Sequence, residues 1–215
     1  MRTILYWASA IVLIVLMYAT RFDTLAREYL ASAYVIRNLV MELVVGLLLV
    51  EGLPRELASR LRVPLPVAWL AGMIPLAIWY GPPLLLASLQ NPGVRIVQAL
   101  SWVIGGALLL LPLYSPAREN RIRPVPHGLI YLAAALIFST LVSLFIGFTH
   151  YGLYRAYLAP ADTLHILDTL QQKFTLTPEM DRQTACLLLW VLSLFAWLWS
   201  AMLLFYRMYR TPETK

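Results

Sequence analysis

The sequence predicts an all-α, polytopic transmembrane bundle of about six helices with one short extracytoplasmic surface helix. Of its 215 residues, 60% are hydrophobic and only 13% are charged, a balance that soluble domains do not have. Several apolar runs reach the roughly 17 to 25 residues that a helix needs to cross a bilayer core. The short alternating segments of outer-membrane barrels are absent. We therefore expect a single integral membrane domain over residues 1–215.

Hydropathy predicts six spans, and proline and glycine mark the connections between them. The spans lie at about 4–20, 33–50, 65–80, 95–113, 128–150 and 184–206. The first resembles a signal peptide, but we interpret it as a retained helix. The third contains Pro75 and ends at "YGPP", so we expect it to be short or kinked.

Arginine and lysine predict the orientation in the plasma membrane. The loops on the side of both termini carry the positive excess, which places both termini in the cytoplasm. The connection over about 151–183 is then extracytoplasmic. Its segment "ADTLHILDTLQQKF" has leucines at helical spacing after Asp162, a possible cap, and predicts a short amphipathic helix on the outer surface. Packing of this helix within the loop is the alternative to contact with lipid.

Several function classes are disfavoured by the same composition. The net charge of +6 is spread over short loops without basic runs, so we expect no nucleic-acid partner. The single cysteine, Cys186, excludes an intrachain disulfide and a cysteine metal cage. Hydrolytic triads, phosphate loops and pairs of haem-ligating histidines are absent. We expect no enzyme and assign no catalytic residue.

Polar side chains gather where five spans meet the outer leaflet. The predicted outer polar layer consists of Tyr34, Arg37, Asn38, Tyr80, Arg95, Gln98, His150, Tyr154, Asp181 and Gln183. Tyr34 and Asn38 share a helix face. His150 is the only weak candidate for a metal ligand in this layer, and a hydrogen-bonded histidine at the membrane interface is the simpler interpretation.

A charge in hydrocarbon is costly unless it is paired or hydrated, so Arg37 and Glu42 should face protein or water. Their i, i+5 spacing points them apart on one helix. We expect Asp181 to pair with Arg37 or with His150. As an alternative, Asp181 caps the start of the sixth span.

Four segments of the chain resemble CtaG-type assembly factors of haem-copper oxidases. They are "RNLVMELVVGLLLVEGLP" (37–54), "WYGPPLLLASLQNP" (79–92), "HYGLYRAYLAP" (150–160) and "DRQTACLLLW" (181–190). The resemblance rests on positions such as Trp79, Asn91, Asp181, Gln183 and Trp190, and it covers most of the chain after residue 33. It implies a helical membrane protein that works beside a haem-copper oxidase.

The histidines of that family are largely missing here. Tyr34 and Asn38 stand where the resemblance implies two helix histidines, Tyr80 follows Trp79, and residues around Arg95 and Gln98 replace a further histidine set. Copper is therefore possible as a cofactor only by resemblance, because tyrosine and amide groups substitute poorly for imidazole.

The leading hypothesis is thus a non-catalytic accessory subunit or assembly factor of a respiratory haem-copper oxidase. Its partners would be membrane lipids and oxidase or other respiratory-chain subunits. Gly105 and Gly106 would allow close approach of a partner helix. The alternatives are a transporter of small molecules or metal ions, and a quinone- or haem-handling protein with a pocket around Arg37, His150 and Asp181.

Overall fold

The protein is helical throughout the part of the chain that the computed structural model describes. These residues are 2–117, 121–122, 125–149, 162–173 and 177–210, and no strand occurs among them. The prediction of an all-α fold is confirmed.

Within the described residues, four helices are long and apolar enough to cross a membrane, and two bent helix pairs raise the number of candidate spans to as many as six. The four are Ala31–Glu51, Pro92–Tyr114, Pro126–Phe148 and Pro178–Arg207. The first pair joins Arg2–Tyr18 to Arg21–Tyr29 with a bend of 51°, and the second joins Leu65–Trp79 to Pro83–Gln90. This agrees with the predicted set of about six spans.

The elements follow one another as α1 (Arg2–Tyr18), α2 (Arg21–Thr24), the π-helix η1 (Leu25–Tyr29), α3 (Ala31–Leu39), the π-helix η2 (Val40–Val45), α4 (Gly46–Glu51), α5 (Arg55–Arg60), α6 (Leu65–Trp79), α7 (Pro82–Gln90), α8 (Pro92–Tyr114), α9 (Val125–Phe148), η4 (Thr169–Lys173) and α11 (Pro178–Arg210). As predicted, α6 is short. α8 starts at Pro92, and the Asn91 side chain before it accepts a hydrogen bond from the Gly93 amide at 2.8 Å.

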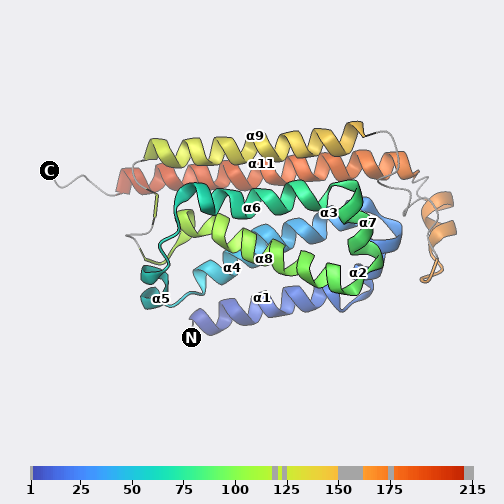
Figure 1. The fold of residues 1–215 in the computed structure, drawn as a ribbon, viewed down its shortest axis with the longest axis horizontal. Coiled ribbons are helices and arrows are strands. Elements are labelled where there is room, and N and C mark those ends of the chain that lie inside the picture. The colour runs from blue at the N-terminus through green and yellow to red at the C-terminus, as the bar shows by residue number, and fades with distance from the viewer. Residues whose placement is uncertain (1, 118–120, 123–124, 150–161, 174–176, 211–215) are drawn as a thin grey trace.

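The helices lie side by side in a bundle (Figure 1). α9 and α11 form one edge and α1 forms the opposite edge, with α3, η2, α4, α6 and α8 between them. α11 packs against α9 and α3, while α8 packs against α6, η2 and α4. The segment Ala31–Glu51 and α8 therefore form the centre of the bundle, and both run in the same direction (Figure 1).

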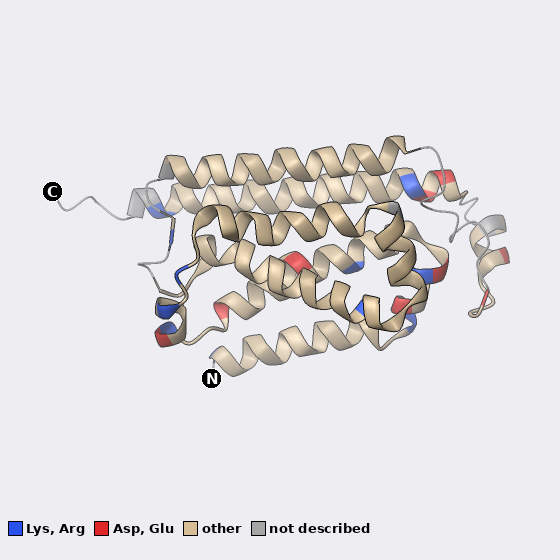
Figure 2. Ribbon diagram, in the orientation of Figure 1, with Lys and Arg blue, Asp and Glu red and all other residues tan. Residues whose placement is uncertain are grey.

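We name the two ends of the bundle for the argument that follows. The polar end is the end where α3 and α8 begin, and the opposite end is where α4 leads into α5. α1 starts and α11 finishes toward the opposite end (Figure 1). Charged residues gather at both ends and are sparse between them (Figure 2).

A short helical segment covers residues 167–173, within the range predicted to form the surface helix. The Asp162 carboxylate accepts hydrogen bonds from the amides of Ile166 at 3.0 Å and Leu167 at 3.2 Å. The Tyr29 hydroxyl in η1 donates a third bond to the same oxygen at 3.0 Å. The predicted capping role of Asp162 is confirmed, and the residue also docks this segment onto η1.

Loss of hydration raises the pKa of the Asp162 carboxyl, but the hydrogen bonds from Tyr29, Leu167 and Ile166 outweigh it. The pKa of Asp162 therefore lies below its usual value.

Candidate functional site

Asp23 is the centre of a charged cluster at the polar end. The Thr20 hydroxyl accepts a hydrogen bond from the Phe22 amide at 3.2 Å and so starts α2 after α1 has ended. The bend of 51° that follows α1 turns this short segment away from the α1 axis. Asp23, in the first turn of α2, is only 6% exposed.

Three guanidinium groups surround this carboxylate. Oδ1 of Asp23 lies 2.6 Å from Nη1 of Arg37, and Oδ2 lies 2.9 Å from Nε of Arg27 and 3.5 Å from Nη1 of Arg95. We call these four residues the Asp23 cluster. Because Arg37 belongs to α3 and Arg95 to α8, a single carboxylate ties α2 and η1 to both central helices.

Arg37 is almost completely enclosed, with 1% of its surface exposed. Its guanidinium carbon lies 4.9 Å from the ring centre of Tyr18 and 5.0 Å from that of Tyr34, in cation–π geometry. A charge without a partner at such a place would cost several kcal/mol. Asp23 and the two rings together offset the free-energy cost of burying the Arg37 charge.

Tyr34 continues the polar layer from Arg37 toward α6 and α8. The Gln98 side-chain amide on α8 donates a hydrogen bond to the Tyr34 hydroxyl. The same hydroxyl lies 3.4 Å from the carbonyl oxygen of Trp79, the last residue of α6. The ring of Tyr80 meets the Tyr34 ring edge to face, with centroids 5.9 Å apart. With Arg95 of the Asp23 cluster, five of the predicted residues are thus linked within one layer: Tyr34, Arg37, Tyr80, Arg95 and Gln98.

Asp181 has a different role from the one expected. Its carboxylate accepts hydrogen bonds from the Ala31 amide at 2.5 Å, from the Ser32 amide at 3.2 Å and from the Ser32 hydroxyl at 2.5 Å. It therefore caps the start of α3 from another span. A negative group is favoured there because the first amides of a helix have no partner within it. The expected pair with Arg37 is wrong, since Asp23 occupies that place. The alternative partner, His150, lies outside the described residues.

Gly105 and Gly106 allow close packing, but the helices involved belong to this chain. Both glycines are buried. A Cβ atom at Gly105 would overlap the carbonyl oxygen of Ala71 in α6, and one at Gly106 would overlap the carbonyl oxygen of Glu42 in η2. The expectation that these two glycines receive a partner helix is therefore corrected: they hold α8 against α6 and η2.

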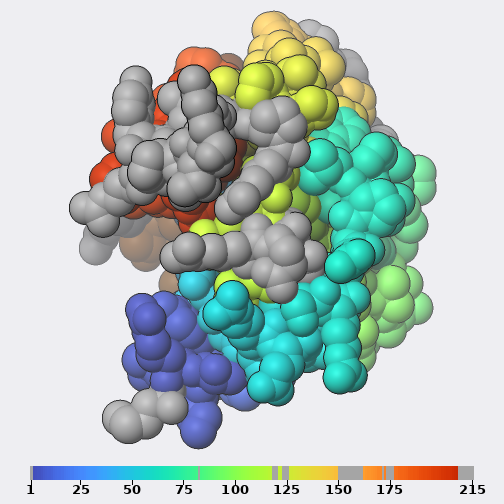
Figure 3. Space-filling model, turned by 90° about the vertical axis from the view of Figure 1, so that its left-hand side faces the viewer, coloured from blue at the N-terminus to red at the C-terminus, as the bar shows by residue number. Residues whose placement is uncertain are grey.

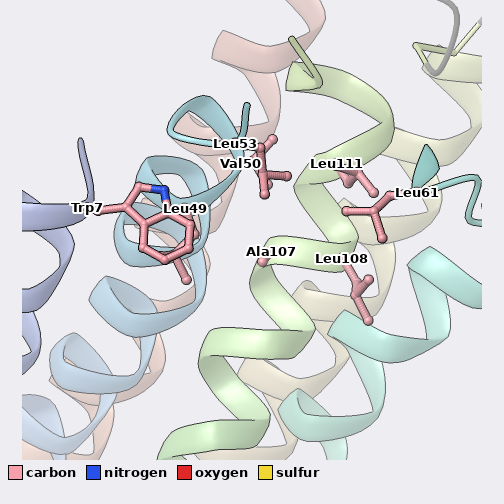
Figure 4. Close-up of a pocket in the computed structure, with 8 residues that line it drawn as sticks. All are labelled: Trp7, Leu49, Val50, Leu53, Leu61, Ala107, Leu108 and Leu111. Carbon is pink, nitrogen blue, oxygen red and sulfur yellow. The ribbon is translucent and has the colours of Figure 1, made fainter. Parts of the chain in front are cut away.

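An apolar pocket lies toward the opposite end, between α1, α4 and α8. Its volume is about 230 Å³, and its lining residues are Trp7, Leu49, Val50, Leu53, Leu61, Ala107, Leu108 and Leu111 (Figure 4). Figure 3 views the molecule from this end, with α1 forming the edge of the bundle. The lining offers hydrocarbon and one indole ring, without any charged group.

Comparison with known proteins identifies the family. Residues 1–211 match the family described as cytochrome c oxidase caa3 assembly factor (Caa3_CtaG). The chain belongs to the CtaG family. No curated protein and no solved structure matches it. Nearly the full length is covered, which confirms the resemblance noted in four short segments.

The described part of this CtaG family member contains no group of three or more His, Cys, Asp and Glu side chains placed to hold a metal ion. His150 and Tyr154 lie outside the described residues. Gln183, in the first turns of α11, is exposed. Asn38 is buried in the centre of the bundle, and neither polar atom of its side chain has a hydrogen-bond partner among the described residues.

Sequence reasoning missed Asp23, although it is the anion that holds the layer together. Residues 21–32 lie between the predicted spans 4–20 and 33–50, so hydropathy assigns them to a connection. The signal was nevertheless present, because Asp23 and Arg27 have the i, i+4 spacing of a helical ion pair and Thr20 stands before them as a cap.

Proposed function

We propose that this chain serves the assembly of a cytochrome c oxidase as a non-catalytic factor or accessory subunit in the plasma membrane. The observation that carries the proposal is the family match over residues 1–211. Its partners would be the membrane subunits of the oxidase. The positive excess in the loops beside α5, together with a start of α1 and an end of α11 that lie toward that end of the bundle, favours an orientation with both termini in the cytoplasm.

The donor chemistry of the polar layer argues against copper as its cargo. Copper in proteins favours imidazole, thiolate and thioether ligands. Among its described residues, the layer offers a phenol from Tyr34, amides from Asn38 and Gln98, and a guanidinium from Arg37 beside them. The positive charge of Arg37 would also repel a metal cation. We therefore assign this layer a structural role.

The interactions of the layer support a scaffold. Asp23 joins α2 and η1 to α3 and α8, and Asp181 joins α11 to α3. Interhelical bonds of this kind hold membrane helices in one arrangement, because hydrocarbon offers no competing partner. A bundle fixed in this way presents constant outer faces to a neighbouring protein.

Co-purification tests the assembly role directly. A tagged full-length chain would replace the native copy, and mild solubilisation would be followed by mass spectrometry of the proteins that co-migrate. We expect oxidase subunits in the eluate, and a lower level of assembled oxidase in a deletion strain. A chain that brings down no oxidase subunit and whose deletion leaves the oxidase level unchanged would refute the proposal.

Two variants separate a scaffold from a copper carrier. Tyr34→Phe and Asn38→Leu remove donor atoms from the layer while keeping approximately the same volume. We expect the assembled oxidase to retain its full copper content per haem in both variants. An oxidase that becomes deficient in copper and recovers when copper is added to the medium would show instead that these side chains pass the metal on.

A further inference from the structure

Glu42 places a carboxyl group halfway along a membrane span. Residue 42 follows Ala31 by 11 positions and precedes Glu51 by 9 in the candidate span Ala31–Glu51. At about 1.5 Å per residue it lies some 16 Å from the start of that span, close to the middle of a bilayer core of about 30 Å. Only 2% of its surface is exposed.

No counter-charge is provided for this group within the described part of the chain. The ion pairs found there all involve Asp23 or Glu28 at the polar end. η2 is contacted by α1, α3, α4 and α8. The charged and titratable side chains that these helices carry are Arg2, Tyr6, Tyr18, Tyr34, Arg37, Glu51, Arg95 and Tyr114. None of the arginines lies within 4.0 Å of the Glu42 carboxylate.

Polar side chains lead from the Asp23 cluster to Glu42. Tyr34, Asn38 and Glu42 follow one another at intervals of four residues on the central span. Two contacts fix the register of α8 beside them: Gln98 is hydrogen-bonded to Tyr34, and Gly106 touches the backbone of Glu42. Since the two helices run in the same direction, Gln98 is level with Tyr34, and Trp102 is level with Asn38.

Several polar atoms along this line have no partner among the described residues. They are both amide atoms of Asn38, Oε1 of Gln98, Nε1 of Trp102, Oε1 of Glu42 and Nε of Arg37. All five residues are at most 2% exposed. Buried polar atoms of this kind are normally satisfied by ordered water. We call Tyr34, Asn38, Gln98, Trp102 and Glu42 the polar file.

The backbone changes its winding where the polar file ends. Residues Val40–Val45 form a π-helix between two α-helical segments. Such insertions are rare and occur frequently at functional sites. Here the π-helix carries Glu42 and faces Gly106 of α8, where an added Cβ would overlap the Glu42 carbonyl oxygen. The unusual winding and the close contact together fix the position of Glu42 against α8.

We propose that Glu42 is a proton-binding site, loaded from the polar end through the polar file. A hydronium ion at the polar end gives its proton to water and side-chain groups along the file, and the Glu42 carboxylate accepts a proton to become a carboxylic acid. Release follows the same route in reverse, so protons balance and no other reactant is needed. The neutral acid is the form that an apolar site without a cation accommodates at least cost.

Infrared spectroscopy of the full chain in lipid vesicles tests this site. A protonated carboxylic acid has a carbonyl-stretching band that a carboxylate lacks. At neutral pH we expect such a band in the wild type, its loss in Glu42→Gln and its retention in Glu56→Gln, the matched control on exposed α5. Because glutamine resembles the neutral acid, Glu42→Gln should also keep the thermal stability of the wild type. A wild type without the band, or a band that survives in Glu42→Gln, would overturn the proposal.

The route is tested by transfer of the vesicles into heavy water. We expect the band to shift rapidly in the wild type as deuterium replaces the proton, and the shift to be slower in Asn38→Leu and Gln98→Leu. Ser139→Ala removes a buried hydroxyl on α9, outside the file, and should exchange like the wild type. Equal exchange in all four proteins would contradict a path along the file. This inference goes beyond the assembly role, and its test requires only the purified chain. The Glu42 proposal and the assembly proposal can therefore be refuted independently.

Discussion

The two ends of the bundle are held by different interactions. At the polar end, buried carboxylates reach across between helices, with Asp23 bound to Arg37 at 2.6 Å and Asp181 bound to the Ala31 amide at 2.5 Å. At the opposite end, α1, α4 and α8 surround an apolar pocket of about 230 Å³. Three arginines of this end, Arg55, Arg60 and Arg62, are exposed.

This difference reflects what each interaction can do in a membrane. Apolar contacts gain little there, because lipid tails solvate leucine as well as another helix does. Directed bonds to charged groups are strong in a medium of low polarity, and they specify which helix meets which. The bonds at the polar end therefore specify which helices pack together. The opposite end has apolar contacts and a pocket between its helices.

The largest effect is expected for Asp23→Asn. This change removes the counter-charge of buried Arg37, and breaking a buried ion pair costs about 3–5 kcal/mol. Unfolding in detergent should show this loss of stability. Asp168→Asn, on an exposed residue of the surface segment, is the control and should behave as the wild type. An Asp23→Asn protein as stable as the wild type would mean that the cluster does not hold the helices.

Gly106→Ala should have the next largest effect. The new methyl group would overlap the Glu42 carbonyl oxygen and push α8 away from η2, at a cost of about 1–3 kcal/mol for an overpacked contact. Gly128→Ala is a matched control, because its new Cβ would meet the tip of the Leu204 side chain, which can move. In thermal unfolding, Gly106→Ala should therefore lower the melting temperature more than Gly128→Ala does.

Asp181→Ala removes the cap of α3 and should cost about 0.5–2 kcal/mol, the range measured for helix caps. The control is Glu179→Ala, an exposed acidic residue of the same first turn. Chemical unfolding in mild detergent would compare the two. If Glu179→Ala were the more damaging change, the capping bonds would not be the reason for Asp181 at this position.

Leu108→Ala at the opposite end should change stability by about 0.5 kcal/mol or less, as for substitutions away from the core. Leu108 is half-buried and lines the apolar pocket, so lipid can replace the contacts that it loses. A loss as large as that of Asp23→Asn would show that apolar packing holds both ends equally.

Acidification should release the segment around Asp162 with the smallest effect on the fold. Because the folded pKa of Asp162 is lowered, its docking bonds are fully formed above the usual aspartate pKa of about 4 and are lost as the pH falls through the lower folded value. Amide exchange of residues 162–167, corrected for the intrinsic rate, should rise at acidic pH. Asp162→Asn removes this titration and should make the difference disappear.

Much of the fold could be predicted from the sequence, because apolar length and proline placement act locally. The apolar runs, the short α6 and the capping role of Asp162 all follow from residues near one another in the chain. The predicted range of the surface segment likewise contains the helical residues 167–173.

The pairing of the polar side chains could not be predicted in the same way. Depth in the membrane indicated that Arg37 needs an anion near the polar end, but it did not distinguish Asp181 from Asp23. Which aspartate pairs with Arg37 depends on the bend after α1, which brings Asp23 to Arg37. It also depends on the contact of α11 with α3, which places Asp181 beside the unpaired amides at the start of α3. Both are properties of tertiary packing.

The bond between Asp181 and Ala31 joins residues that are 150 positions apart. During synthesis, the segment that begins at Ala31 leaves the ribosome long before residue 181 exists. The amides at the start of this segment therefore lack their Asp181 partner until the last span is inserted. Chains truncated before residue 178 should remain accessible to membrane chaperones and proteases, because the hydrogen bonds between Asp181 and the start of the second span form last.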